Sequence, residues 1–187
     1  MAANMRHDGG HGRVPWRVVG WGAAALLLSL PAIAMRFTAE VDWDETDFIV
    51  MGIMIAAVGL GIEFLVRKSN SLAYRLGAVL ALLTAFLTIW ANLAVGMIGS
   101  EDNGFNLLFG GMLAVALTGA AVSKFEPAGM ARATVVTAIV QAMVSAVGLS
   151  ADVRGGVFSM AFAGLWLLAA FLFRKAARET ARVDATV

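Results

Sequence analysis

Residues 76–99 read LGAVLALLTAFLTIWANLAVGMIG, a run of 24 residues without an ionisable side chain. At about 1.5 Å of rise per residue, a helix of this length crosses a hydrocarbon layer roughly 30 Å thick. Five further apolar stretches of spanning length accompany it, and the six together contain a single ionisable residue, Glu63. The predicted spans are 18–35, 48–65, 76–99, 106–122, 133–150 and 157–173.

The composition of the whole chain agrees with this pattern. Of the 187 residues, 60% are hydrophobic and only 14% are charged, whereas soluble domains are about one quarter charged. Backbone polar groups in lipid must be satisfied within each segment. We therefore predict an all-α bundle of six transmembrane helices in three hairpins over 18–173. A basic N-terminal tail, 1–17, and a C-terminal tail, 174–187, flank it.

Lysine and arginine predict the orientation of the bundle. With both termini in the cytoplasm, twelve basic residues fall inside and only Arg36 and Arg154 fall outside. Short loops rich in Lys and Arg stay on the cytoplasmic side, so both termini are predicted to be inside. The twelve are Arg6, Arg13, Arg17, Arg67, Lys68, Arg75, Lys124, Arg132, Arg174, Lys175, Arg178 and Arg182.

The first span has two interpretations. A basic leader, an apolar run and the small-residue motif Ala32-Ile33-Ala34 also fit a cleavable secretory signal. Residues 18–35 are long enough to span, which favours a retained helix. Cleavage would leave five spans and the same topology for the rest.

Several kinds of chemistry find no support in the sequence. There is no cysteine, and the two histidines, His7 and His11, lie in the polar N-terminal tail. No serine-hydrolase, zinc-protease or phosphate-loop motif occurs. We predict no catalytic residue, no metal site, no cofactor and no nucleic-acid partner.

Glu63 is the first candidate for a functional residue. Intramembrane carboxylates are costly and by default suggest a site. Glu63 also precedes Arg67 by four residues near the cytoplasmic end of its span, so a helical ion pair explains it equally simply. Structural pairing and proton or cation handling are the two alternatives.

Asn92 and Gln141 are the strongest polar groups at mid-depth. Asn92 belongs to a stripe of small and polar residues on its helix, and Gln141 belongs to a similar stripe on the fifth helix, which we expect to be its packing partner. Such stripes predict close helix packing with interhelical hydrogen bonds, and a permeation path is the alternative. The stripes are Gly77, Ala81, Thr84, Thr88, Asn92, Gly96 and Ser100, and Thr134, Thr137, Gln141, Ser145 and Gly148, with Gly110, Ala114 and Thr118 on the fourth helix.

Acidic residues gather on the side predicted to be outside. The run 40–47, EVDWDETD, and the residues Glu101, Asp102 and Asp152 supply oxygen ligands of the type that calcium prefers. The run lacks the glycine and the spacing of a calcium loop, so we interpret these residues as solvated acids, and a cation site is the alternative. Asp44 and Asp47 are expected to cap the second helix, and Ser100, Asp102 and Asn103 the fourth.

The run 90–103, WANLAVGMIGSEDN, resembles the signature of a family of small polytopic bacterial inner-membrane proteins without an assigned function. The resemblance extends to Glu40-Val41-Asp42-Trp43 with Asp47-Phe48, to Ala73-Tyr74-Arg75 and to 129–133, GMARA. Where the family has Pro-Ala after this signature, the chain has Gly104-Phe105. The resemblance implies the bacterial inner membrane and transfers no activity.

The matching residues suggest where a function would lie. Glu40, Trp43, Asp47, Asn92, Glu101, Asp102 and Asn103 fall at or near the outer ends of their helices. They predict an outward-facing polar cluster, and as structure alone they are caps and loop anchors. We expect a non-enzymatic accessory or regulatory protein that associates with the bilayer and with a membrane-protein partner or a second copy. A small transporter or channel is the alternative, and a membrane enzyme is the third.

Overall fold

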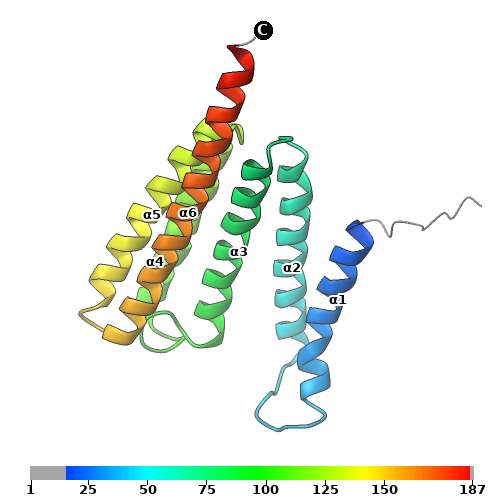
Figure 1. Cartoon of the computed structure of the whole chain (residues 1–187). Coiled ribbons are helices and arrows are strands. Elements are labelled where there is room, and N and C mark those ends of the chain that lie inside the picture. The colour runs from blue at the N-terminus through cyan, green and yellow to red at the C-terminus, as the bar shows by residue number, and fades with distance from the viewer. Residues whose placement is uncertain (1–15, 186–187) are drawn as a thin grey trace, which may run out of the picture. The chain divides into compact units, whose positions relative to one another are not determined.

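The computed structural model describes residues 16–185, and helices are the only regular secondary structure in that range (Figure 1). Six helices are long and apolar enough to cross a membrane, which confirms the all-α class and the number of spans. The N-terminal tail with His7 and His11 lies outside the described residues. The elements are α1 (Trp16–Ala34), α2 (Glu45–Val66), α3 (Leu72–Ala94), the 3-10 helix η1 (Gly104–Asn106), α4 (Leu107–Val122), α5 (Pro127–Gly148) and α6 (Val153–Asp184).

Side-chain caps set several helix starts. At the start of α2, the backbone N–H of Asp47 donates to the carboxylate of Asp44 at 2.9 Å and that of Asp44 to Asp47 at 3.0 Å, as predicted. Ser71 caps α3, Asp152 caps α6, and Pro127 occupies the first turn of α5, where no backbone N–H is needed.

The chain divides into two units, and the boundary falls within α2 between Ile55 and Ala56. The first unit comprises α1, the connection 35–44 and the first part of α2. Within it, Leu28 of α1 lies close to Gly52 of α2, because a Cβ at Gly52 would be 3.7 Å from the Leu28 side chain. The two helices therefore approach each other at this point.

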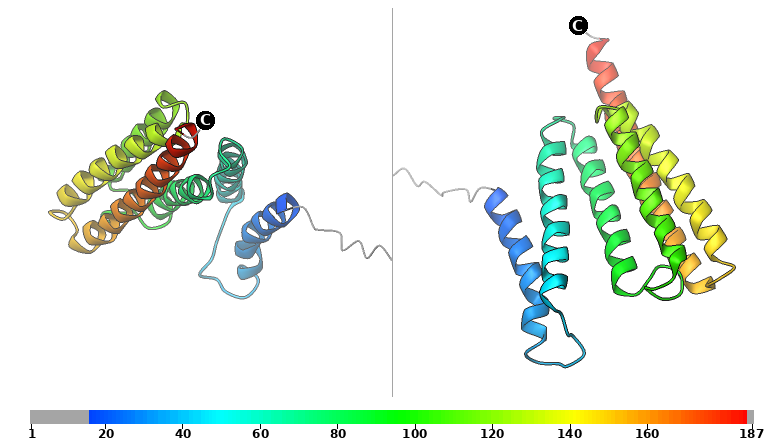
Figure 2. Two further views of the ribbon diagram at one scale, coloured as in Figure 1. Left: turned by 45° about the horizontal axis from the view of Figure 1, so that its top comes forward. Right: turned by 180° about the vertical axis from the view of Figure 1, so that it is seen from behind.

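In the second unit, α6 is the central helix. Its main partners are α5 and α3, while α4 packs chiefly on α5 (Figure 2). The core between them holds Tyr74, Met112, Trp166 and Phe173 among many alanines. Trp90 and Trp166 lie deep in their spans, which predicts that both pack against neighbouring helices. Trp166 is buried, but Trp90 is 44% exposed.

The helix partners differ from the prediction. We expected the polar stripe of α3 to face that of α5, but the buried residues of both stripes lie in helices that pack mainly against α6. Helices α3 and α4 are consecutive, yet they touch little. Gly110, Ala114 and Thr118 of α4 are exposed instead of forming part of a seam.

The last helix is longer than its apolar stretch. The predicted tail 174–187 is helical to Asp184. The hydroxyl of Ser71, before α3, donates to Glu179 in this extension at 2.7 Å. The Tyr74 hydroxyl donates to the Phe125 carbonyl at 2.6 Å, which holds the α4–α5 turn at the same end. We call this end, with residues 67–75, 123–132 and 174–185, the basic end, and the opposite end, with 95–106 and 149–154, the acidic end.

Candidate functional site

The signature run ends in a folded loop at the acidic end. Helix α3 stops at Ala94, and Gly96 and Gly99 then adopt φ values of +74° and +73°. This left-handed region suits glycine and few other residues. A Cβ at Gly96 would also collide with the backbone of Ser100. The two glycines therefore let the chain fold back over the end of the bundle.

Between these glycines, Met97 and Ile98 point into the protein. Their side chains are 2% and 0% exposed. Ile98 packs with Ala91, Phe109 and Phe162 in a separate apolar cluster. The loop therefore plugs the acidic end of the bundle.

Gly148 at the end of α5 makes room for this plug. A Cβ added there would lie only 2.6 Å from the Ile98 side chain. The last turn of α5 and the loop are therefore matched in shape.

Two asparagine amides hold the loop backbone. Asn106 accepts from the N–H of Ile98 at 2.9 Å and donates to the carbonyl of Ser100 at 2.8 Å. Asn103 accepts from the N–H of Phe105 at 3.0 Å and donates to the carbonyl of Ile98 at 3.1 Å. Asn103, a candidate site residue, therefore anchors the loop, which agrees with the second of the two interpretations of these residues, that of caps and loop anchors.

Asp152 joins this loop to the α5–α6 connection. Its carboxylate accepts from the N–H of Gly99 at 3.1 Å and from that of Arg154 at 3.0 Å. Hydrogen bonds from the backbone of Gly155 and then Gly99 hold the pKa of the Asp152 carboxyl below its ordinary value. One carboxylate thus fixes two loops that are far apart in sequence.

The remaining acidic candidates do not assemble into a metal site. Glu101 and Asp102 are exposed on the loop. Within residues 16–185, no three Asp, Glu or His side chains are close enough to share a metal ion.

In the first unit, the candidates Glu40, Trp43 and Asp47 lie in the connection before α2 or in its first turn. The N–H of Glu40 donates to the Thr38 hydroxyl at 3.1 Å, and Asp47 belongs to the cap described above. The Trp43 ring meets that of Phe48 edge to face at 5.3 Å.

Gln141 lies in a buried polar cluster between α5 and α6. Its amide Nε2 donates to the carbonyl of Ser159 at 3.0 Å, and the Ser159 hydroxyl contacts that of Ser145 at 2.7 Å. The Ser145 hydroxyl in turn donates to the Gln141 carbonyl at 2.8 Å. All three side chains are 0% exposed, so this cluster is the interhelical hydrogen bonding that the α5 stripe predicts.

Asn92 and the neighbouring threonines bond to their own helices. Asn92 Nδ2 donates to the Thr88 carbonyl at 2.7 Å, and the hydroxyl of Thr88 donates to the Thr84 carbonyl at 2.8 Å. Thr134 and Thr137 of α5 do the same. Three buried polar atoms have no partner among the described residues: Asn92 Oδ1, Gln141 Oε1 and Trp166 Nε1.

Glu63 forms the predicted pair with Arg67. A guanidinium nitrogen lies 3.4 Å from the carboxylate, and Glu63 is buried while Arg67 is exposed. Both line an open cavity of about 400 Å³ together with Leu60, Phe64 and Lys68. The carboxylate is thus paired and also reachable from this cavity.

The sequence analysis missed two polar residues that anchor the structure, Asn106 in the loop and Ser159 in α6. Asn106 was assigned to the start of the fourth span, although an asparagine shortly after Asn103 indicates a turn. Ser159 lies among apolar residues of α6, and only the tertiary structure places it beside Gln141.

The chain matches no family model, no curated protein and no solved structure. The family resemblance therefore stays a prediction. The arrangement itself supports packing and anchoring roles for Asn103, Asn106, Gln141 and Asp152.

Proposed function

We propose that the chain is a non-enzymatic accessory or regulatory protein of the bacterial inner membrane, with both termini in the cytoplasm. It would act by associating with another membrane protein or with a second copy. The twelve basic residues on one predicted side, against two on the other, support this orientation.

One observation carries the proposal. The polar side chains in the stripes of α3 and α5 form their hydrogen bonds within the protein: Thr84, Thr88, Asn92, Thr134 and Thr137 donate to carbonyls of their own helices. Gln141 and its serine neighbours bond to one another. A transport path needs such groups to face a solute. Because these side chains form hydrogen bonds within the protein, they favour a structural role, in which the outer surface of the bundle binds a partner.

Copurification tests this proposal directly. The tagged chain is extracted from its native membrane in mild detergent, and the eluate is analysed by mass spectrometry. We expect a membrane protein in stoichiometric amount, or a homo-oligomer by light scattering. A monomer recovered alone in several detergents would contradict the proposal.

A small cation transporter is the second candidate, and Glu63 favours it. This buried carboxylate borders a cavity of about 400 Å³, and the oxygens of Asn92 and Gln141 are unpaired within the described residues. Neither side chain lines that cavity. Transport predicts a cation flux into proteoliposomes that Glu63→Gln abolishes and Glu126→Gln, an exposed control, preserves.

A further inference from the structure

A groove runs between α4 and α5 at the basic end of the second unit. It has a volume of about 690 Å³, and its walls include Ala114, Thr118 and Gly119 of α4 and Ala133 and Val136 of α5. Most of the lining side chains are small or apolar, and Thr118 and Ser123 contribute the hydroxyl groups. Its lining is suited to a hydrocarbon chain.

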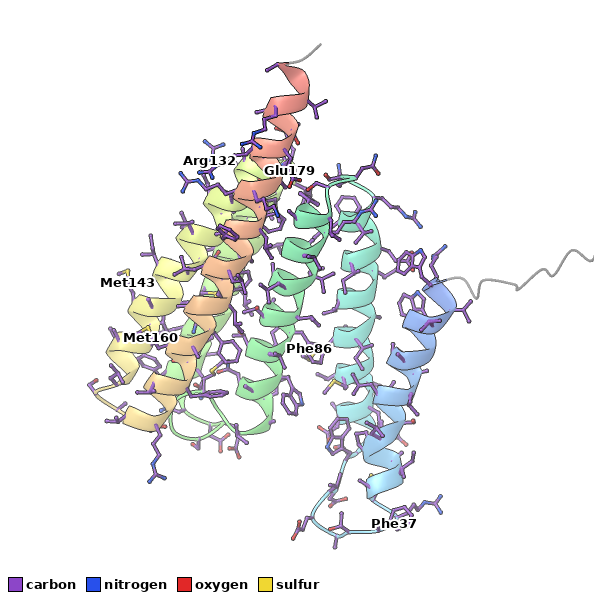
Figure 3. All side chains as sticks on the ribbon, in the orientation of Figure 1. Phe37, Phe86, Arg132, Met143, Met160 and Glu179 are labelled. Atoms are coloured by element: carbon purple, nitrogen blue, oxygen red, sulfur yellow. The ribbon has the colours of Figure 1, made fainter. Side chains whose placement is uncertain are left out.

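One cation marks the end of this groove. Arg132 lines it and is exposed, and its guanidinium has no hydrogen bond or ion pair with another residue of the described part. Figure 3 shows Arg132 at the end of the unit that also carries Glu179. Guanidinium groups bind phosphates through paired, charge-assisted hydrogen bonds.

The depth of the groove matches the geometry of a lipid. On α4 it extends from Ser123 to Ala114, which is about 13 Å along the helix axis at 1.5 Å per residue. Arg132 lies in the second turn of α5, within reach of the headgroup region through its long side chain. The charge is therefore at headgroup depth, and the apolar walls continue from it into the hydrocarbon.

We propose that this groove binds an anionic phospholipid, with the phosphate on Arg132 and an acyl chain between α4 and α5. Basic pockets between transmembrane helices on the cytoplasmic side are typical sites for such headgroups. Lys and Arg are enriched at the cytoplasmic ends of transmembrane helices and would repel Arg132, whereas a lipid phosphate would attract it, which favours the lipid as occupant. The inference does not depend on the accessory role.

Native mass spectrometry of the full chain tests the proposal. The protein is exchanged into detergent with dioleoylphosphatidylglycerol or, as a neutral reference, dioleoylphosphatidylcholine, and bound lipid is counted. We expect the anionic lipid to be retained preferentially. Arg132→Gln should weaken this binding about tenfold, the effect of losing one charged hydrogen bond.

Two further variants separate charge from shape. Ala114→Phe fills the groove and leaves Arg132 in place, so it should also lose the anionic lipid. Arg178→Gln removes an exposed cation of α6 that does not line the groove, and it should bind like the wild type. Circular dichroism confirms that each variant is folded.

Three results would overturn the proposal: equal retention of both lipids by the wild type, unchanged binding in Arg132→Gln, or an equal loss in Arg178→Gln. Ala114→Phe dissociating a dimer without losing lipid would assign the groove to a second copy instead.

Discussion

Asp152 shows how a single side chain can organise one end of this protein. Its carboxylate caps α6 and accepts a hydrogen bond from Gly99, 53 residues earlier in the chain. These backbone hydrogen bonds favour the ionised form and lower its pKa. The stabilisation they give is present above the pKa of the unfolded chain, and it is lost as the pH falls through the lower pKa of the folded state.

Asp152→Asn tests this linkage, because asparagine can still cap the helix but carries no charge. At pH values above about 4, we expect the variant to have a lower melting temperature than the wild type. The difference should shrink as the pH falls further. Thermal unfolding in detergent between pH 2.5 and 7 measures it. Asp102→Asn, at an exposed position of the same loop, should match the wild type, and a difference independent of pH would contradict the argument.

The serine pair in the buried cluster allows a second residue-level prediction. The hydroxyls of Ser145 and Ser159 are 2.7 Å apart and fully buried. A double-mutant cycle with Ser145→Ala and Ser159→Ala should give a coupling energy of about 0.6 kcal/mol, up to about 1.7. Unfolding in mixed micelles measures it. Ser150→Ala combined with Ser159→Ala should show no coupling, since Ser150 bonds only to its own turn.

At the scale of elements, the loop 95–106 is the least replaceable connection. It contributes Met97 and Ile98 to the interior and depends on two glycines with positive φ. A side chain at Gly96 would occupy the space of the Ser100 backbone. The loop therefore tolerates little variation at this position.

Gly96→Val should destabilise the protein by about 1–2 kcal/mol from the backbone conformation alone. The rate of amide hydrogen exchange should increase in residues 95–106 before it increases in the helices, because the loop would unfold locally first. Gly104→Ala is the matched control, since no atom lies within 4 Å of its added methyl group. Equal exchange in the two variants would show that the plug is not a structural requirement.

The sequence predicts the elements better than their partners. Long stretches without charged residues predict all six helices, and Asp44 and Asp47 predict a helix cap. Both features depend only on residues that are close together in the sequence. The partner of α3 could not be predicted, since a stripe such as Thr84 and Thr88 says which face is buried and not which helix covers it. The covering face of α6 combines Phe173 with Ala169 and Ala176, and alanines are too common throughout the chain to identify it.

The candidate site shows the same division. Glu63 and Arg67 are four residues apart, so their pairing follows from helix geometry. The bonds of Gly99 to Asp152 and of Gln141 to Ser159 join different elements and arise only in the tertiary structure. Trp90 was misjudged because its depth in the span gives no information on which side of the helix it occupies.

At the scale of the whole molecule, the charge asymmetry makes a clear topological prediction. A reporter that is active only in the cytoplasm should be active when fused after residue 185 or within 67–71. A reporter active only in the periplasm should respond when inserted within 101–103. The reverse pattern of reporter activity would show that the protein has the opposite orientation to the one predicted. Arg67, Lys68 and Arg75 replaced together by glutamine should weaken the preference, while Arg36→Gln should not.

The length of α6 has a practical consequence. A helix of 32 residues is about 48 Å long, well beyond the roughly 30 Å of the hydrocarbon layer. Its final turns, joined to the start of α3 through Glu179, must stand in the aqueous phase. An affinity tag after residue 185 would therefore clear a detergent micelle, and soluble proteins could reach this handle without touching lipid.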